Sequence, residues 1–432
     1  MSNHLSPLFP VALLFGAITP MAQGQGATFE ALGNLSPTAP MSIALAIAAD
    51  GSVVVGTSID TDAKAHAVRW GRTGGSGGSS ILRSDPDPLP DLFESIQAVA
   101  VSADGSRIAC NLWEGPSCST PYTISLPSGH TDTLSSMRCN ALARAVSSDA
   151  VVGEFYGATS RGLRWDVAGG GATTFLPTPP QYTSASVVAV TNDGRIAVGE
   201  SQGPSGARAT VWRDGRDPYF IGEVPATPPF YHISRCTAIS EFGGFIVGEQ
   251  YRNLRGPDID AFMYSVASEE LVVLGALPPG QKATPTAVNN EGTVIVGCLY
   301  TQLPTLSRIA FIWRRGEGIE NLQTVLAAEH GLDLQGWTLI SANGLSRNSR
   351  EIVGEGINPQ GNTQAWRASL PAPQGVLCIA DFDESGGVDG ADVEAFFIAW
   401  SGNDERADAN QDGGVDGQDV EAFFIPWEAG GC

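Results

Sequence analysis

The chain has 432 residues, with 46 acidic side chains, 24 lysines and arginines, and a formal net charge of −22. This balance argues against a nucleic-acid-binding protein, because contacts to phosphates need clustered basic side chains. Only two lysines occur, Lys64 and Lys282, so the sequence also lacks a polybasic segment for an anionic membrane surface. Glycine (52) and proline (28) are frequent and long helical patterns are scarce, which favours an all-β fold in a chain long enough for two or more domains.

Residues 1–24 have the pattern of a secretory signal peptide. A short apolar run at residues 11–18 precedes the small residues around Ala22-Gln23-Gly24, as in the apolar region and cleavage site of a leader. The alternative is a disordered or buried N-terminal strand, since no lysine or arginine precedes the run. No later run reaches the roughly 18 apolar residues of a transmembrane helix. We therefore expect a secreted protein without a transmembrane segment, located outside a bacterial cell or at its surface.

Residues 27–371 contain one motif seven times, and these copies are named repeats one to seven. The first, residues 43–56, alternates apolar and small residues, crosses an Asp-Gly turn and continues into a valine-rich stretch. Asp-Gly and Asn-Gly are typical of hairpins with primed turns, whose twist matches paired strands. Each copy therefore predicts two strands. The motifs end at Gly56, Cys110, Gly153, Gly199, Gly248, Gly297 and Gly354.

Two further strands follow in most repeats. The third ends in an aromatic residue, which we expect to belong to the core between repeats, with ligand stacking as the alternative. These aromatic residues are Trp70, Trp165, Trp212, Tyr264, Trp313 and Trp366. The fourth strand is exemplified by residues 270–275 and 217–222. Four strands per repeat, seven times, predict a seven-bladed β-propeller.

The last repeat has no fourth strand after it, but a matching strand precedes the first repeat at residues 28–33. We infer that this N-terminal strand completes the last blade and closes the ring, which hides an edge that would otherwise aggregate. The motif resembles the extracellular HAF repeat family, with His66-Ala67-Val68 as the nearest equivalent of its His-Ala-Phe segment. That family has no well-defined activity to suggest.

Four of the motif-ending glycines are followed by a glutamate. These candidate ligand residues of the propeller are Glu154, Glu200, Glu249 and Glu355. Equivalent positions of a propeller lie on a circle, so the four carboxylates could bind a cation or a sugar at one end of it. The alternative is a set of solvated acids at strand ends. The histidines lie in different repeats without a serine or cysteine partner pattern, so we predict no catalytic residue.

Seven cysteines are present and none has the spacing of a zinc site. Some should pair in an oxidising compartment. We expect a disulfide between Cys378 and Cys432, which bracket the C-terminal segment. The other five can form at most two bridges, and their pairing is left open: Cys110, Cys118, Cys139, Cys236 and Cys298.

The C-terminal segment contains two acidic loops, residues 381–392 and 408–419, which align at an offset of 27 residues. Calcium takes about six to eight oxygen ligands, and this spacing of oxygen side chains around a glycine wraps a loop around the ion. The alternative is an acidic linker without metal. We predict two calcium ions, with ligands at loop positions 1, 3, 5, 7, 9 and 12. These are Asp381, Asp383, Ser385, Gly387, Asp389 and Asp392 in the first loop, and Asp408, Asn410, Asp412, Gly414, Asp416 and Asp419 in the second.

The same apolar helix follows each loop, at residues 393–400 and 420–427. A loop and one helix, twice, resembles a dockerin domain. It is most similar to the bacterial GC-type dockerin, which opens with cysteine and ends in Gly-Cys, as Cys378 and Gly431-Cys432 do. The resemblance covers residues 378–432, after a linker at 372–377. It implies calcium-dependent folding and docking onto a cohesin-like receptor on a scaffold or cell surface. The receptor contacts that it implies are loop positions 10 and 11, which are Gly390, Ala391, Gly417 and Gln418.

Two functions remain open at this point. The first is a secreted, calcium-binding, dockerin-anchored β-propeller that acts as a binding or surface-assembly module, with a polysaccharide as a candidate ligand. The second is a polysaccharide-degrading enzyme, a glycoside hydrolase or lyase, with a catalytic propeller and a dockerin anchor. An enzyme would need two or three acids that converge in a pocket and have raised pKa values.

Overall fold

The computed structural model describes residues 27–36, 41–71, 80–81, 94–114, 118–126, 128–134, 139–167, 172–204, 206–221, 233–251, 259–275, 277–278, 280–301, 307–370, 379–383, 388–402, 404–409 and 414–428. The expected signal peptide, the linker, Cys378, Cys432, Ser385, Gly387, Asn410 and Asp412 lie outside these residues.

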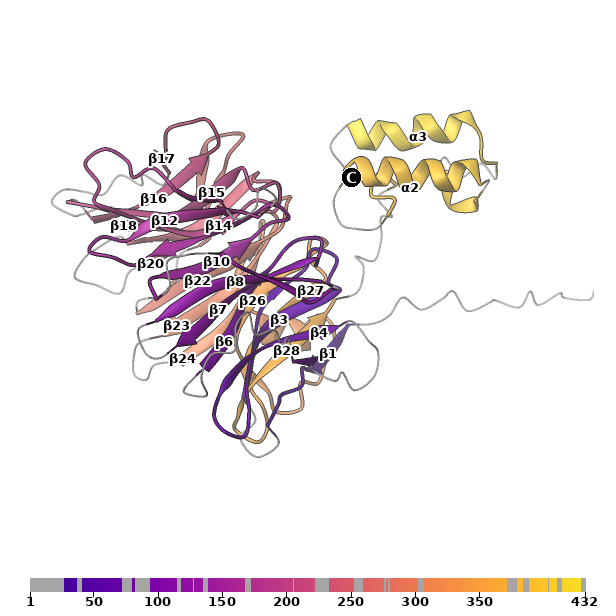
Figure 1. Ribbon diagram of the computed structural model, residues 1–432. Coiled ribbons are helices and arrows are strands. Elements are labelled where there is room, and N and C mark those ends of the chain that lie inside the picture. Colours follow the sequence, from indigo (N-terminus) through magenta and orange to yellow (C-terminus); the bar gives the residue numbers. More distant parts are fainter. Residues whose placement is uncertain are drawn as a thin grey trace, which may run out of the picture.

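Strands dominate residues 28–369, and they are grouped by repeat (Figure 1). Repeat one contributes β2 (Ser42–Ile47), β3 (Val53–Ile59), β4 (Ala65–Gly71) and β5 (Ser80–Ile81). Repeat two contributes β6 (Glu94–Val101), β7 (Arg107–Glu114), β8 (Ser119–Ser125) and β9 (His130–Thr133). Repeat three contributes β10 (Ala141–Val146), β11 (Ala150–Phe155), β12 (Arg161–Asp166) and β13 (Ala172–Phe175). Repeat four contributes β14 (Ser184–Val190), β15 (Ile196–Gly203), β16 (Gly206–Arg213) and β17 (Tyr219–Phe220).

The later repeats follow the same order. Repeat five contributes β18 (Ile233–Ile239), β19 (Phe245–Tyr251), β20 (Ile259–Ser265) and β21 (Glu270–Val273). Repeat six contributes β22 (Gln281–Val288), β23 (Val294–Thr301), β24 (Ser307–Arg314) and β25 (Gly318–Asn321). Repeat seven contributes β26 (Thr338–Leu345), β27 (Glu351–Ile357) and β28 (Thr363–Ser369). A parallel bridge between Ile259 and Lys282 joins repeats five and six into one eight-stranded sheet.

The sheet of repeat seven takes its fourth strand from the other end of the chain. β1 (Thr28–Ala31) pairs antiparallel with β28, with Thr28 opposite Ser369 and Ala31 opposite Trp366. The predicted pairing of the N-terminal strand with the third strand of repeat seven is therefore present. Phe29 packs against Trp337 and Trp366, with ring centroids 5.4 and 6.1 Å apart.

The first strands of the repeats lie in the middle of the assembly. Each contacts the first strand of the next repeat, in the order β2, β6, β10, β14, β18, β22 and β26, and β26 contacts β2 again. Residues from all seven line one cavity of about 300 Å³. The hydrophobic clusters lie between neighbouring sheets. The predicted core role of the aromatic series is confirmed for its five tryptophans, each at most 5% exposed, whereas Tyr264 is partly exposed.

The motif-ending glycines have a steric cause. A register shift in each first strand brings a backbone carbonyl toward the second strand, as between Ala44 and Ala46. A Cβ atom on Gly56 would collide with the carbonyl oxygen of Ile43, and one on Gly354 with that of Ser341. A glycine at this position therefore lets the two strands approach.

The hairpins are present, but the predicted primed turns are wrong. A two-residue primed turn of the Asp-Gly type needs positive φ at both central residues. Among the described residues, no aspartate has positive φ, whereas Gly51 has φ 74°. The Gly51 amide donates to the carbonyl of Ala48 at 3.0 Å, which makes the glycine the last residue of a four-residue turn. The Asp50 carboxylate accepts from the Ser52 amide at 2.8 Å, so its role in the turn is structural.

Helices are few. α1 (Leu322–Ala328) connects β25 to β26 and buries Leu322, Val325 and Leu326. α2 (Gly390–Ser401), the short 3-10 turn η1 (Glu405–Ala407) and α3 (Gly417–Glu428) form the C-terminal unit (Figure 1). Asp389, which caps α2, lies 3.9 Å from Arg347 of repeat seven. Phe396 of α2 stacks on Phe423 of α3, with centroids 4.2 Å apart and an interplanar angle of 9°. No helix in the described part of the chain is long and apolar enough to span a membrane.

Candidate functional sites

The first acidic loop brings three predicted ligands together. Asp381, Asp383 and Asp392 each contribute one carboxylate oxygen, and these three oxygens lie within 4.8 Å of one another. The backbone amides of Asp383 and Asp389 donate to the two carboxylate oxygens of Asp392, at 3.0 and 2.8 Å. Asp392 is buried, and burial raises the pKa of its carboxyl group to about 6 while the charge of Asp383 adds to the rise. Converging carboxylates of this kind can hold a divalent cation, since a bound cation would relieve their mutual repulsion.

The second loop repeats two of the hydrogen bonds of the first. Asp419 is buried like Asp392, and its carboxylate accepts from the Asp416 amide at 2.7 Å. Asp416 in turn accepts from the Gln418 amide at 2.8 Å, as Asp389 does from the Ala391 amide at 2.7 Å. Loop position 9 (Asp389 and Asp416) therefore caps the start of the following helix in both units. The carboxylate at position 12 (Asp392 and Asp419) accepts from the amide of position 9 and so closes the loop.

The two loop–helix units are also locked to each other, which sequence reasoning missed. The indole Nε1 of Trp400, in α2, donates to the carbonyl of Asp416 in the second loop at 2.7 Å. The indole Nε1 of Trp427, in α3, donates to the carbonyl of Asp389 in the first loop at 3.2 Å. The signal for this reciprocal pair was the tryptophan at the same place in both repeats of the tail.

The predicted receptor contacts lie at the start of the helices and face solvent. Gly390, Ala391, Gly417 and Gln418 are all exposed. The helices also carry exposed apolar side chains, of which Ile398 and Ile425 are each 66% exposed. These two isoleucines occupy the same place in the two units, so the tail presents two similar surfaces.

Three of the four propeller glutamates are buried. Glu249 is completely buried, whereas Glu154 and Glu355 are each 7% exposed. Each is paired: Glu154 lies 3.4 Å from an Arg144 nitrogen and accepts from the Ser186 hydroxyl at 3.0 Å. Glu355 lies 2.7 Å from Arg308. The alternative of solvated acids at strand ends is therefore wrong for these three residues.

Glu249 shows what this position does. It accepts from Nε and Nη2 of Arg235 at 2.9 and 2.7 Å within its own repeat. It also accepts from the hydroxyl of Thr284, which lies on the first strand of the next repeat. The Glu154–Ser186 contact likewise joins repeat three to repeat four. These carboxylates hold neighbouring sheets together.

Glu200 is the exception. It is half-buried, and burial raises the pKa of its carboxyl group. The nearby charges of Glu154 and Glu249 add to the rise, whereas Arg235 opposes it. Within the described residues Glu200 forms no hydrogen bond, because Arg235 is engaged by Glu249. Glu200 is thus the one of the four acids that lacks both a hydrogen bond and an ion pair among the described residues, and it lies near enough to Glu154 and Glu249 for their charges to act on its pKa.

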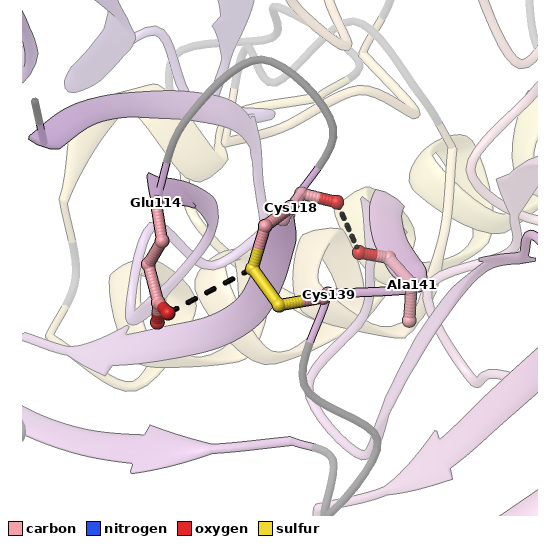
Figure 2. The surroundings of a disulfide bond; sticks show 5 residues. Glu114, Cys118, Cys139 and Ala141 are labelled. Atoms are coloured by element: carbon pink, nitrogen blue, oxygen red, sulfur yellow. Dashed lines mark hydrogen bonds between the residues drawn. A yellow bond between two sulfur atoms is a disulfide. The ribbon is translucent and has the colours of Figure 1, made fainter.

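A disulfide joins repeats two and three. Figure 2 shows the bond between Cys118, which precedes β8, and Cys139, which precedes β10. The Ser119 hydroxyl donates to the carbonyl of Ala141 at 2.7 Å beside it. The Glu114 carboxylate lies 3.7 Å from Sγ of Cys118. This contact is not a hydrogen bond, since a disulfide sulfur carries no proton, and the bonded sulfurs are poor metal ligands.

The remaining described cysteines, Cys110, Cys236 and Cys298, are free and buried. Burial raises the pKa of the Cys110 and Cys236 thiols to about 12, so neither is a nucleophile at neutral pH. One bridge and three free thiols among these five cysteines agree with the limit of two bridges.

Comparison with known proteins identifies the fold. No protein-family model matches the chain, and no curated protein matches its sequence. An oligogalacturonate lyase from Vibrio parahaemolyticus is 12% identical, with a TM-score of 0.51 over 81% of this chain and 99% of the other. A prolyl endopeptidase is also 12% identical, with a TM-score of 0.52 over 77% of this chain. The chain spans about half (51%) of that enzyme's length.

The β-propeller domain of the Trilobed protease from Pyrococcus furiosus is 11% identical, with a TM-score of 0.49 over 76% of this chain and 95% of the other. At these identities the likeness concerns the fold alone. The strand-rich body of the chain has a β-propeller fold.

Proposed function

We propose that this is a secreted, calcium-binding protein in which a seven-bladed β-propeller is anchored by a C-terminal dockerin to a cohesin-like partner. The propeller then acts as a binding or surface-assembly module for polysaccharide. The observation that carries the proposal is the reciprocal bracing of the two loop–helix units by Trp400 and Trp427. Each tryptophan fixes the loop of the other unit, which supports the proposal that the two calcium sites are linked.

The residues present suit calcium. The predicted calcium ligands that lie within the described residues are all carboxylate or carbonyl oxygens, which are the ligands that a hard cation prefers. Asp381, Asp383 and Asp392 already converge, and in the second loop Asp419 accepts from the Asp416 amide as Asp392 does from the Asp389 amide. Bound calcium would neutralise acids that otherwise oppose folding of the tail. The two linked surfaces that carry Ala391 and Gln418 would then face the receptor.

Seven blades and ring closure account for the arrangement of the body. Seven first strands line the axial cavity, and β1 supplies the fourth strand of the last blade. Pairing the two ends of the body in one sheet is a way to close a ring without leaving an exposed edge. The expected N-terminal signal peptide and a disulfide in the body fit export into an oxidising compartment.

Calcium binding is tested by titration calorimetry of the full chain after chelator treatment. We expect two ions per chain. Asp381→Ala combined with Asp408→Ala, which removes position 1 of both loops, should abolish the heat of binding. Asp404→Ala is the matched control, because it removes an acid of the same tail that pairs with Arg406 instead. A chain that takes up no calcium, or takes it up equally in the double variant, would refute the calcium sites.

Docking is tested with immobilised full chain against a panel of cohesin modules, with calcium and with chelator. We expect capture only with calcium, and loss of capture when Ala391→Arg and Gln418→Arg are combined. Each single variant should retain capture if the two surfaces are equivalent. Capture that is indifferent to chelator would contradict calcium-dependent docking.

The second candidate is an enzyme that degrades polysaccharide. The raised pKa of Glu200, to which burial and the charges of Glu154 and Glu249 contribute, favours it. Glycan-array binding and a product-release assay on the same polysaccharides separate the candidates. Release that is lost in Glu200→Gln supports the enzyme, whereas binding without release supports the binding module.

A further inference from the structure

A second cleft lies between repeats three and four, at the end of the strands opposite to Glu200. It has a volume of about 420 Å³. Leu176, Pro177, Ala197 and Trp212 supply apolar walls. The charged side chains around it are Arg164, Arg195, Arg213, Arg216, Asp214 and Asp217. Arginines outnumber acids here, in a chain whose net charge is −22.

The equivalent position of repeat six has the opposite charge balance. Arg213 follows Trp212 at the end of the third strand of repeat four, and Arg314 follows Trp313 in repeat six. Arg314 is neutralised by three glutamates at 2.6 to 2.7 Å: Glu317, Glu320 and Glu329. Three residues after Arg213 the chain has Arg216 in place of such a glutamate. The same site is thus acidic in repeat six and basic in repeat four.

The nearby acids do not neutralise this charge. Asp214 lies 3.3 Å from Arg164, whose guanidinium also donates to the carbonyl of Gly194. Asp193 holds its own turn by accepting from the Thr191 hydroxyl and the Arg195 amide. Its contact to the Arg195 side chain is 3.8 Å, between two exposed groups. In the described residues, Arg213 and Arg216 form no side-chain ion pair.

Elsewhere in the body, several buried glutamates form an ion pair with an arginine. Arg235 binds Glu249, Arg308 binds Glu355, and Arg367 binds Glu351, each at 2.7 Å. Arg213 and Arg216 differ, because both are exposed, both line the cleft, and neither forms an ion pair among the described residues. Planar guanidinium groups bind carboxylate and sulfate in bidentate fashion, so such a pair suits an anion.

We propose that the cleft between repeats three and four binds an acidic sugar unit, a uronate or a sugar sulfate, through Arg213 and Arg216. The volume is within the range of small-molecule pockets, and the apolar wall suits the carbon face of a sugar ring. The negative charge of the ligand follows from the arginines. The choice of a sugar rests on the proposed polysaccharide-binding function.

The test is titration calorimetry of the full chain with three probes: a galacturonic acid trimer, a galactose trimer carrying sulfate esters, and the neutral galactose trimer. We expect an acidic trimer to bind at least tenfold more tightly than the neutral one. Affinity should fall at least tenfold in Arg213→Gln combined with Arg216→Gln. The acidic trimer that binds more tightly identifies the preferred anion.

Arg315→Gln is the matched control, since it removes the same charge at an exposed position of repeat six, and it should leave the affinity unchanged. Arg213→Lys combined with Arg216→Lys keeps the charge but loses the bidentate geometry, and it should lie between wild type and the glutamine variant. Equal binding of acidic and neutral trimers, or undiminished binding in the glutamine variant, overturns the proposal. Binding of the neutral trimer alone overturns it while leaving the proposed polysaccharide function intact, whereas binding of no trimer counts against both.

Discussion

Arg347 of repeat seven donates to both carboxylate oxygens of Glu241 in repeat five, at 2.6 and 2.9 Å. The two residues are 106 positions apart and lie at the turns that follow the first strands of their repeats. The Arg347 amide also donates to the carbonyl of Ala49 in repeat one at 2.8 Å. A single arginine thus ties the last repeat to the first and to the fifth around the mouth of the axial cavity.

Glu241→Gln should lower the free energy of unfolding by about 1.5–3 kcal/mol, because a charge-assisted bidentate pair is lost and Arg347 stays partly buried. The pair is well shielded, with side chains 23% and 12% exposed. Chemical denaturation of the full chain measures the effect. Asp404→Asn, at an exposed ion pair with Arg406, is the control and should leave the unfolding midpoint unchanged. Equal midpoints for both variants would show that the Arg347 pair is dispensable.

The sequence predicted the strands well because strand signals are local. Alternating apolar residues and a glycine turn identify a hairpin wherever it occurs, as at Gly51. The turn type was wrong, since the spacing that places Gly51 fourth in the turn is set by pairing of Ala48 with Val53. α1 was missed because its seven residues form barely two turns, with only three buried side chains.

The site could be predicted in part, for the same reason. Loop positions follow one another in the chain, so Asp381 and Asp392 could be assigned as neighbours. The pairing of Glu249 with Arg235 and Thr284 could not, because it depends on how adjacent sheets pack. For this reason the four glutamates look alike in sequence, although only Glu200 lacks both a hydrogen bond and an ion pair among the described residues.

Removal of β1 should destabilise the body far more than trimming an ordinary terminus. Residues 28–33 supply a whole strand, and the Leu32 amide donates to Ala365 at 2.9 Å. Phe29→Ala alone should cost about 2 kcal/mol, less than the 3–5 of a fully buried phenylalanine, because Phe29 is partly exposed. Thermal unfolding compares the deletion of 28–33 with a chain that starts at residue 27. A melting temperature within a degree or two of this control would rule out closure through β1.

The Cys118–Cys139 bond should stabilise the folded chain by about 3 kcal/mol, since it closes a loop between residues 21 positions apart in the unfolded state. Cys118→Ser, Cys139→Ser and the double variant should therefore lose the same amount, because each removes the one cross-link. Denaturant titration measures the three values. If the double variant lost clearly more than either single variant, the individual side chains would matter more than the bond.

Titration of the Glu200 carboxyl group should make the free energy of unfolding depend on pH, at pH values above the usual pKa of a glutamate. Its pKa is raised in the folded state above the usual value near 4.5, so the folded chain binds more protons than the unfolded chain in that window. Stability therefore falls as pH rises through the folded pKa. Glu200→Gln should flatten this slope and raise the stability at pH 7. Glu249→Gln breaks the pair with Arg235, so it should lower the stability at pH 7. Unfolding curves between pH 4 and 8 test both signs, and an unchanged slope in Glu200→Gln would count against a raised pKa.

Each tryptophan of the tail should control the calcium affinity of the opposite loop. Trp400→Phe keeps the aromatic packing but removes the indole donor to the Asp416 carbonyl, so the second loop should bind calcium about fivefold more weakly, as expected for one hydrogen bond worth about 1 kcal/mol. Trp427→Phe should weaken the first loop in the same way, through the Asp389 carbonyl. Calorimetry of each variant, combined with Asp381→Ala or Asp408→Ala so that one loop remains, assigns the loss to a site. Trp113→Phe is the control, because it removes a buried indole N–H of the body that has no hydrogen-bond partner among the described residues. A loss confined to the tryptophan's own loop, or none at all, would mean that the two units bind calcium independently.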